Sequence, residues 1–273
     1  MSREQTIVFD GHVHVYPAWK LSAALNALFA NLARCAPPSE PAPVRVGLLA
    51  DHAACRGYRG RIGQPRLKQV DEFILQPSDE AGAMIVRDED RVLGYVLAGR
   101  QIVTADRLVV LSLASDADVA DGLPLDQTLT AIRGNGGVPV LNWAPGLWTG
   151  ARGQLVRKAV ENSTPTDFLL GDSALRPSGW PEPAGFKLGR RRGLRIVRGT
   201  DALLLSGETR RLGTCATVVR GPWDPAHPVT SLRHLLTTAS YPLTPAGRRL
   251  SLSGFAIRWA RRMMRAVPKK EGA

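Results

Sequence analysis

The sequence predicts an α/β fold with a mostly parallel sheet that closes into a barrel. Short apolar stretches typical of strands alternate with stretches of helical periodicity, which is the pattern of such folds. Polar residues directly follow several of these strands. No internal repeat or long linker divides the 273 residues. A chain of this length can form one large domain or two small ones with a buried core. In a barrel, functional groups are expected at the C-terminal ends of the strands.

The N-terminal part begins with a strand and a helix. Residues 7–9 are apolar and partly β-branched, as in a buried strand. Leucines recur at helical spacing over 18–35, and the proline-rich segment 37–43 ends that helix. A second strand is expected over 44–49.

The central part is more irregular. Residues 56–70 are rich in glycine and arginine and show no regular periodicity. A polar turn joins two apolar stretches, 83–87 and 91–97, and so predicts a hairpin. Another strand is expected over 108–113.

The remaining elements alternate between helix and strand. Helices are expected over 124–132, ended by a glycine-rich segment, and over 154–161. Strands are expected over 138–141, 168–170 and 194–197. This order favours parallel strands joined by helices.

Two histidines flank one residue at the end of the first predicted strand. Because residues i and i+2 of a strand point the same way, His12 and His14 can converge on one point. Two neutral imidazoles on a rigid element are a good start for a divalent metal site. The alternative to a metal site is that the two histidines are polar side chains at a strand end that form only local hydrogen bonds. Later strand ends carry further candidates, which are Asp51 and His52, Arg100 and Gln101, Asn142 and Trp143, Asp172, and Asp201.

In this order the motifs resemble those of the PHP (polymerase and histidinol phosphatase) superfamily of metal-dependent phosphoesterases. The matching segments are 10–14 for its His-x-His strand, 50–52 for Thr-Asp-His, 99–101 for Gly-x-Glu, 136–145 for Ala-His-Pro and 200–203 for Ser-Asp-Ala-His. The resemblance covers roughly residues 7–220. It implies a distorted seven-stranded (β/α) barrel, (β/α)7, over residues 1–245 and a hydrolase acting on phosphoesters.

The motifs also depart from the family at ligand positions. The bridging glutamate is Gln101, the Ala-His-Pro histidine is replaced by Asn142 or Trp143, and the last histidine is Leu203. The resemblance then implies a reduced, single-metal site of His12, His14 and Asp201, whereas His52 belongs to a different metal position. The ion would be Zn, Mn or Mg. Three protein ligands and a water suffice for a catalytic divalent ion.

The same residues define the predicted reaction, hydrolysis of a small or polymeric anionic substrate. Asp172, with Asn142, is the candidate catalytic group, and a turn-forming aspartate is its alternative. Asp10, Asp51 and Gln101 would surround the metal ligands, and the two aspartates would accept hydrogen bonds from the imidazoles. For Asp51, a helix N-cap is an equally good interpretation. Arg100, Arg176 and Trp143 would contact the substrate, with salt bridges and loop packing as alternatives.

Two other functions compete with a hydrolase. A non-catalytic barrel of the same ancestry would bind a ligand or partner, since Gln101 and Leu203 remove charge and ligation where the chemistry needs them. An amidohydrolase-type barrel shares the His-x-His opening but needs a lysine near a strand end, which this sequence lacks.

Basic charge is concentrated in the predicted C-terminal tail, residues 246–273. The chain carries a net charge of +12, of which residues 248–273 supply +7. This uneven distribution argues against nucleic acid as the partner. Phe255, Trp259, Met263 and Val267 fall on one face of a helix whose other face is arginine-rich. Such a helix either binds an anionic membrane surface or docks onto the barrel.

Cysteine usage and the N-terminus predict a cytoplasmic protein, peripheral at the membrane if the tail binds lipid. Cys35, Cys55 and Cys215 are scattered without paired spacing and are expected to be free thiols. The first residues contain no apolar leader, and no stretch has the apolar length of a membrane span.

Overall fold

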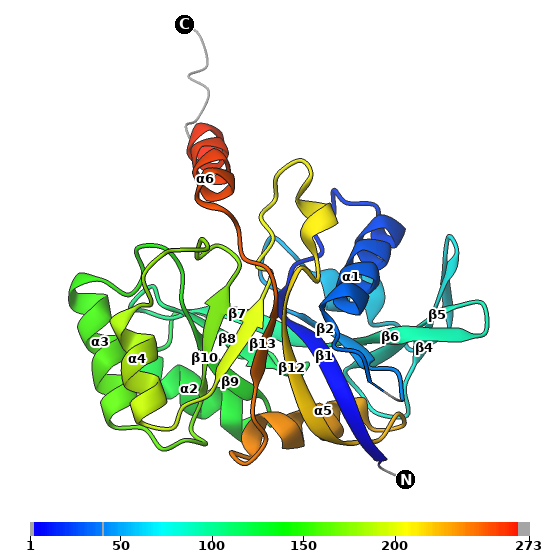
Figure 1. The fold of residues 1–273 in the computed structure, drawn as a ribbon, viewed down its shortest axis with the longest axis horizontal. Helices are drawn as coiled ribbons and strands as arrows, with labels where there is room; N and C mark the ends of the chain where they lie inside the picture. Colours follow the sequence, from blue (N-terminus) through cyan, green and yellow to red (C-terminus); the bar gives the residue numbers. More distant parts are fainter. Residues whose placement is uncertain (1–2, 40, 267–273) are drawn as a thin grey trace, which may run out of the picture.

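The structure is a computed structural model, and it describes residues 3–39 and 41–266. Two mixed β-sheets pack face to face, and helices cover their outer faces (Figure 1).

The larger sheet has eight strands, in the order β13-β12-β1-β2-β6-β5-β4-β3. Strands β1, β2 and β6 run parallel, and the other neighbours in this sheet are antiparallel. The strands are β1 (Arg3–Val13), β2 (Val44–Leu49), β3 (Lys68–Val70), β4 (Phe73–Pro77), β5 (Ala83–Asp88), β6 (Arg91–Leu97), β12 (Cys215–Trp223) and β13 (Thr244–Gly247).

The smaller sheet has five strands, in the order β11-β10-β9-β8-β7. Its members are β7 (Gly99–Val103), β8 (Val109–Leu113), β9 (Val138–Asn142), β10 (Leu169–Ser173) and β11 (Ile196–Gly199). The helices are α1 (Leu21–Cys35), α2 (Leu125–Gly134), α3 (Gly150–Glu161), α4 (Ala184–Arg191), α5 (Pro228–Thr237) and α6 (Leu252–Ala266), with short helical turns at Tyr58–Ile62 and Glu208–Arg211.

Side-chain alternation along the strands divides the core into three layers. In β1, Ile7 and Phe9 lie between the two sheets, whereas Val8 faces α1 on the outer side. Helix α5 closes one end of the layer between the sheets. Helices α2, α3 and α4 pack on the outer face of the smaller sheet. Ile7, Val8 and Phe9 are fully buried, as expected of the first predicted strand.

The predicted barrel is wrong, because the strands form two open mixed sheets. Sheet edges are left at β3 and β13 in the larger sheet and at β7 and β11 in the smaller one. Strands β7, β8 and β9 are successively antiparallel, and β12 runs antiparallel to β1, so the chain does not follow a repeated parallel β-α pattern. The apolar pattern predicts where strands lie, but it does not show whether neighbouring strands run parallel or antiparallel.

The two sheets come close at one end of β1 and β2. The backbone N–H of Asp201, just after β11, donates to the carbonyl of His12 in β1 at 2.8 Å. Beyond β2, the N–H of Asp51 donates to the carbonyl of Gly99 in β7 at 3.1 Å. These contacts bring residues from both sheets to a common point.

The C-terminal region leaves the body of the molecule. Strand β13 spans the predicted boundary at residue 245, and α6 then projects away from the sheets (Figure 1). The basic amphipathic helix predicted there corresponds to α6, and Val267 of its predicted apolar face lies outside the described residues. Within the described ranges no helix has the length and hydropathy needed to cross a bilayer.

Candidate metal centre

Three predicted ligands meet between the sheets. The Nε2 atoms of His12 and His14 each lie 3.6 Å from Oδ1 of Asp201. The three side chains are almost completely inaccessible, with 2%, 3% and 8% of their residue surface exposed. Ligand atoms around a tetrahedral ion are separated by roughly 3.4 Å when the ion–nitrogen bonds are about 2.1 Å. The observed spacing therefore fits one small divalent ion.

Local backbone geometry aims these groups at one another. The pairing of β1 with β2 shifts register between Asp10 and Val13, so His12 lies in an irregular stretch of the strand. Such irregularities redirect side chains near functional sites. Asp201 adopts a left-handed backbone conformation, with φ of 49°, which aspartate tolerates better than most residues. The chain thus turns directly after β11 and presents the carboxylate to the imidazoles.

Asp10 holds the backbone segments that carry His12 and Asp201 together. Its carboxylate accepts hydrogen bonds from the backbone N–H of His12, Thr200 and Gly213, and from the Thr200 hydroxyl. Complete burial raises the pKa of Asp10 to about 6, although these hydrogen bonds act in the opposite direction. Asp10 therefore joins β1 to the segment after β11, and its partners are not the imidazole rings for which it was predicted.

The two imidazoles share one carboxylate unequally. Burial lowers the pKa of His12, and Asp201 only partly opposes this. Burial also disfavours a proton on His14, but the interactions of its ring with Asp201 and Cys55 together outweigh that effect and raise the pKa to about 9. The desolvation of Asp201 is likewise outweighed by the two rings, which hold its pKa well below the usual range. Without a metal ion, His14 therefore carries the proton that pairs with Asp201.

Amide side chains complete the immediate surroundings. Oε1 of Gln101 lies 3.0 Å from Nε2 of His12 and offers a neutral oxygen to the same point. Asn142, at the end of β9, also interacts with His12, and its Nδ2 donates to the Trp143 carbonyl at 3.2 Å. The Nδ1 atoms of His12 and His14 are buried and have no hydrogen-bond partner in the described part of the chain.

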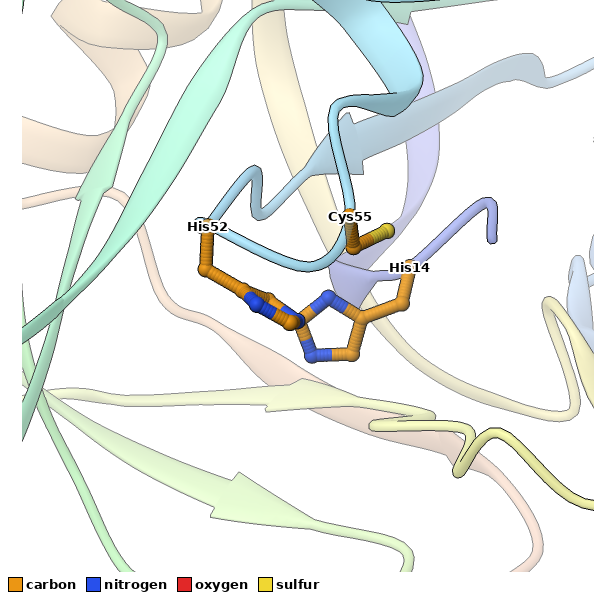
Figure 2. Close-up of side chains that lie close together, drawn as sticks. All are labelled: His14, His52 and Cys55. Carbon is orange, nitrogen blue, oxygen red and sulfur yellow. The ribbon is translucent and has the colours of Figure 1, made fainter. Parts of the chain in front are cut away.

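A second cluster, of His14, His52 and Cys55, adjoins the first. The rings of His14 and His52 meet edge to face, with centroids 5.0 Å apart, and Cys55 lies above the His14 ring (Figure 2). Potential ligand atoms of the three residues lie within 4.8 Å of one another. Cys55 was not predicted as a site residue, yet its His-x-x-Cys spacing from His52 is a metal-ligand pattern that could have identified it. All three cysteines are free, as predicted.

Asp51 and His52 lie at the entrance to this region. The Asp51 carboxylate accepts hydrogen bonds from the backbone N–H of Tyr58 and Arg59, so it caps the short helical turn at Tyr58–Ile62, which was the alternative reading. Burial is the main cause that lowers the pKa of His52, to about 4. Both residues line a cavity of about 270 Å³ together with Arg56 and Arg100. His52 connects this cavity with the buried ligands, because its ring also contacts that of His14.

Asp172 and Arg176 lie in a separate cluster of charged groups. One edge of the Arg176 guanidinium binds Asp172 in a bidentate manner, since Nε and Nη2 donate to the two carboxylate oxygens, each at 2.8 Å. Arg249 donates to the same carboxylate at 2.7 Å, and Arg198 lies 3.6 Å from it. Asp172 is 3% exposed. The predicted catalytic and substrate-binding residues thus pair with each other.

The two other predicted substrate contacts also have protein partners. Arg100 pairs with Asp118 and Asp121 on the cavity wall, whereas Arg56 lines the same cavity without an ion-pair partner among the described residues. Trp143 is 6% exposed and packs in the hydrophobic cluster outside the smaller sheet, away from solvent.

Comparison with known proteins bears on the fold alone. No protein-family model and no curated protein matches this sequence, so the PHP resemblance stays a prediction. The crystal structure of PsfC from Pseudomonas syringae PB-5123 is similar, with a TM-score of 0.55 and 14% sequence identity. The match covers 96% of this chain and 98% of PsfC. The two chains therefore share an overall fold.

Proposed function

We propose that this chain is a hydrolase that uses one divalent cation, held by His12, His14 and Asp201, on an anionic substrate. The supporting observation is the convergence of two Nε2 atoms on one carboxylate oxygen, each at 3.6 Å, in a buried position. The donor set of two imidazoles and one carboxylate suits Zn²⁺ and also accommodates Mn²⁺.

The charge of the donor set favours an anion as substrate. One carboxylate balances half of the charge of a divalent ion, so a loaded site keeps a net charge of about +1. Bound there, such an ion supplies Lewis acidity and a nucleophile at neutral pH, as required to hydrolyse a phosphoester. Gln101 adds no charge to the site. On the cavity wall, Arg100 is neutralised by Asp118 and Asp121, whereas Arg56 has no ion-pair partner among the described residues and can attract an anion.

Metal content and turnover of the full chain test this proposal. We expect the purified protein to bind one equivalent of Zn²⁺ or Mn²⁺ at this site and to hydrolyse an aryl phosphoester only when loaded. His12→Ala should lose both properties, whereas His227→Ala, which removes an exposed histidine, should keep both. Failure of the wild-type chain to bind a cation through His12 would refute the proposal.

A non-catalytic binding module is the second candidate. It is supported by the neutral Gln101 beside His12 and by Asp172, whose oxygens are occupied by arginines. Binding of the cation without turnover on any phosphoester or other anionic ester would favour this module over the hydrolase.

We also propose that α6 attaches the protein to an anionic membrane surface. The helix contains no acidic residue, and it exposes Ile257, Trp259 and Met264 by 52%, 40% and 68%. Its Arg258 side chain bonds to the buried Glu208 at 2.5 Å and thereby ties the helix base to the body. Apolar side chains interleaved with arginines are typical of helices that lie in the lipid headgroup region.

Flotation with liposomes tests the membrane proposal. The full chain should float with vesicles that contain phosphatidylserine and much less with purely zwitterionic vesicles. Ile257→Glu combined with Met264→Glu should abolish flotation, whereas Leu155→Glu, at a 38% exposed position on α3, should not. Equal flotation of the α6 variant and the wild type would contradict the proposal.

A further inference from the structure

We propose that His14, His52 and Cys55 form a second cation site, which takes a thiophilic divalent ion such as Zn²⁺. This inference concerns a different donor set from that of the proposed hydrolase, and the two sets share only His14.

The turn that carries His52 and Cys55 is built to hold both side chains together. The N–H of each residue donates to the carbonyl of the other at 2.9 Å, which closes the four-residue segment 52–55. Asp51, directly before this turn, is itself fixed by its hydrogen bonds to Tyr58 and Arg59. Two donors three residues apart on a closed turn are a recurring arrangement in zinc sites.

His14 can serve this second site through a nitrogen that the first site leaves unused. Its Nε2 lies 3.6 Å from Asp201, whereas its Nδ1 is buried and without a hydrogen-bond partner in the described residues. An unpaired buried polar atom is costly unless a partner arrives. The two ring nitrogens diverge, so a single imidazole can face two ions. When both ions are bound, the His14 ring loses both of its protons and bridges the ions as an imidazolate, and the Cys55 thiol loses its proton; these protons pass to solvent.

The chemistry of the donors selects the ion. A thiolate and imidazoles favour Zn²⁺ and disfavour Mg²⁺, which requires oxygen ligands. Cys55 is fully buried, and of the three donors only His52 lines the cavity of about 270 Å³, so an ion and a fourth ligand would approach from the His52 side. Within the described residues no other cysteine belongs to a group of potential metal ligands.

Cobalt substitution provides a direct readout of a thiolate ligand. We propose to titrate the metal-free full chain with Co²⁺ and to follow the near-ultraviolet absorption of sulfur-to-cobalt charge transfer. The wild type should develop this band, and Cys55→Ser should lose it. Cys215→Ser is the matched control, because Cys215 is equally buried but lies in β12, outside either cluster. Circular dichroism of each variant verifies that the fold is retained.

Two further variants separate this inference from the proposed hydrolase. Asp201→Asn should weaken the first site and keep the charge-transfer band, whereas His52→Gln, at a partly exposed position, should keep the fold and weaken cobalt binding at the second site. Cobalt bound by the wild type without the band, or a band that survives in Cys55→Ser, would overturn the second site while leaving the hydrolase intact. A band without metal-dependent turnover would support the second site and count against the hydrolase.

Discussion

Asp201 and Asp172 occupy comparable places in the smaller sheet but have opposite environments. Asp201 lies two residues after the end of β11, and Asp172 lies near the end of the neighbouring strand β10. Both are nearly inaccessible to solvent. Asp201 faces two imidazoles that can lose their protons, whereas Asp172 faces guanidinium groups, which remain charged.

This difference separates a site that can exchange its cation from one that cannot. A proton on His14 can be displaced from Asp201 by a metal ion, because imidazole binds metals in its neutral form. The arginines of Asp172 are not displaced in this way, and one of them, Arg249, joins the segment after β13 to the sheet. Asp201 therefore suits chemistry, and Asp172 suits structural cross-linking.

Removal of the Asp172 carboxylate should have the largest effect on stability. Asp172→Ala leaves the buried Arg176 and its neighbours without a counter-charge, and breaking a buried ion pair from one side costs about 3–5 kcal/mol. Asp201→Ala should cost less, because His14 can then become neutral. Urea denaturation of both variants, with the exposed Glu72→Ala as control, measures the difference. Equal losses of unfolding free energy in Asp172→Ala and Asp201→Ala would show that the two aspartates do not differ in their contribution to stability.

Between pH 6.5 and 9 the stability should depend on the protonation of His14, the partner of Asp201. The folded-state pKa of His14, about 9, exceeds its ordinary value of 6.5, so the folded chain binds this proton more tightly than the unfolded chain. The stabilisation is fully present below pH 6.5 and is lost as the pH rises through 9, by no more than about 3 kcal/mol. Denaturation of metal-free protein across this range should show the loss, and His14→Gln should remove it. A wild type whose stability rises from pH 6.5 to 9 would contradict the assignment.

Metal affinity should distinguish the same two aspartates. Asp201→Asn should weaken Zn²⁺ binding at the His12 site by more than about 100-fold, since the loss of an outer hydrogen-bond partner alone costs about 10–100-fold. Asp172→Asn should change it little. Competition titration against a zinc-binding dye, carried out in the Cys55→Ser background, restricts the measurement to this site. Similar losses in both variants would show that Asp172 supports the metal centre.

The smallest effect is expected from Arg249→Gln. This variant removes one hydrogen bond from Asp172 but also removes one of three like charges, while the two hydrogen bonds from Arg176 remain. We expect a loss of no more than about 1.5 kcal/mol in the free energy of unfolding. A loss as large as that of Asp172→Ala would mean that Arg249, rather than Arg176, is the essential partner.

The sequence predicted the local parts of the fold better than their pairing. The buried strand at 7–9 and the helix at 18–35 follow from apolar periodicity, and both are present in β1 and α1. Strand direction depends on distant neighbours, so the barrel was wrong. The strand β7 begins two residues after β6 ends yet belongs to the other sheet, and no periodicity signals such a change.

In the candidate site, too, the sequence predicted local features better than contacts between distant segments. His12 and His14 could be found from their spacing, and Asp201 from its place after a strand and the resemblance of its motif. The pairing of Asp172 with Arg176 was visible as a four-residue spacing, but its contacts with Arg198 and Arg249 depend on tertiary structure. Cys55 was overlooked because a cysteine without a second cysteine nearby gives a weak signal.

The hydrogen bonds of Asp10 have a consequence for synthesis on the ribosome. Its partners Thr200 and Gly213 are 190 and 203 positions downstream, so they emerge long after the histidines. Pairings between distant segments form slowly, because a long loop must close first. A nascent chain therefore lacks the Thr200 and Gly213 partners of Asp10 until those residues have been synthesised. Until that point, β1 is an apolar segment that chaperones can shield.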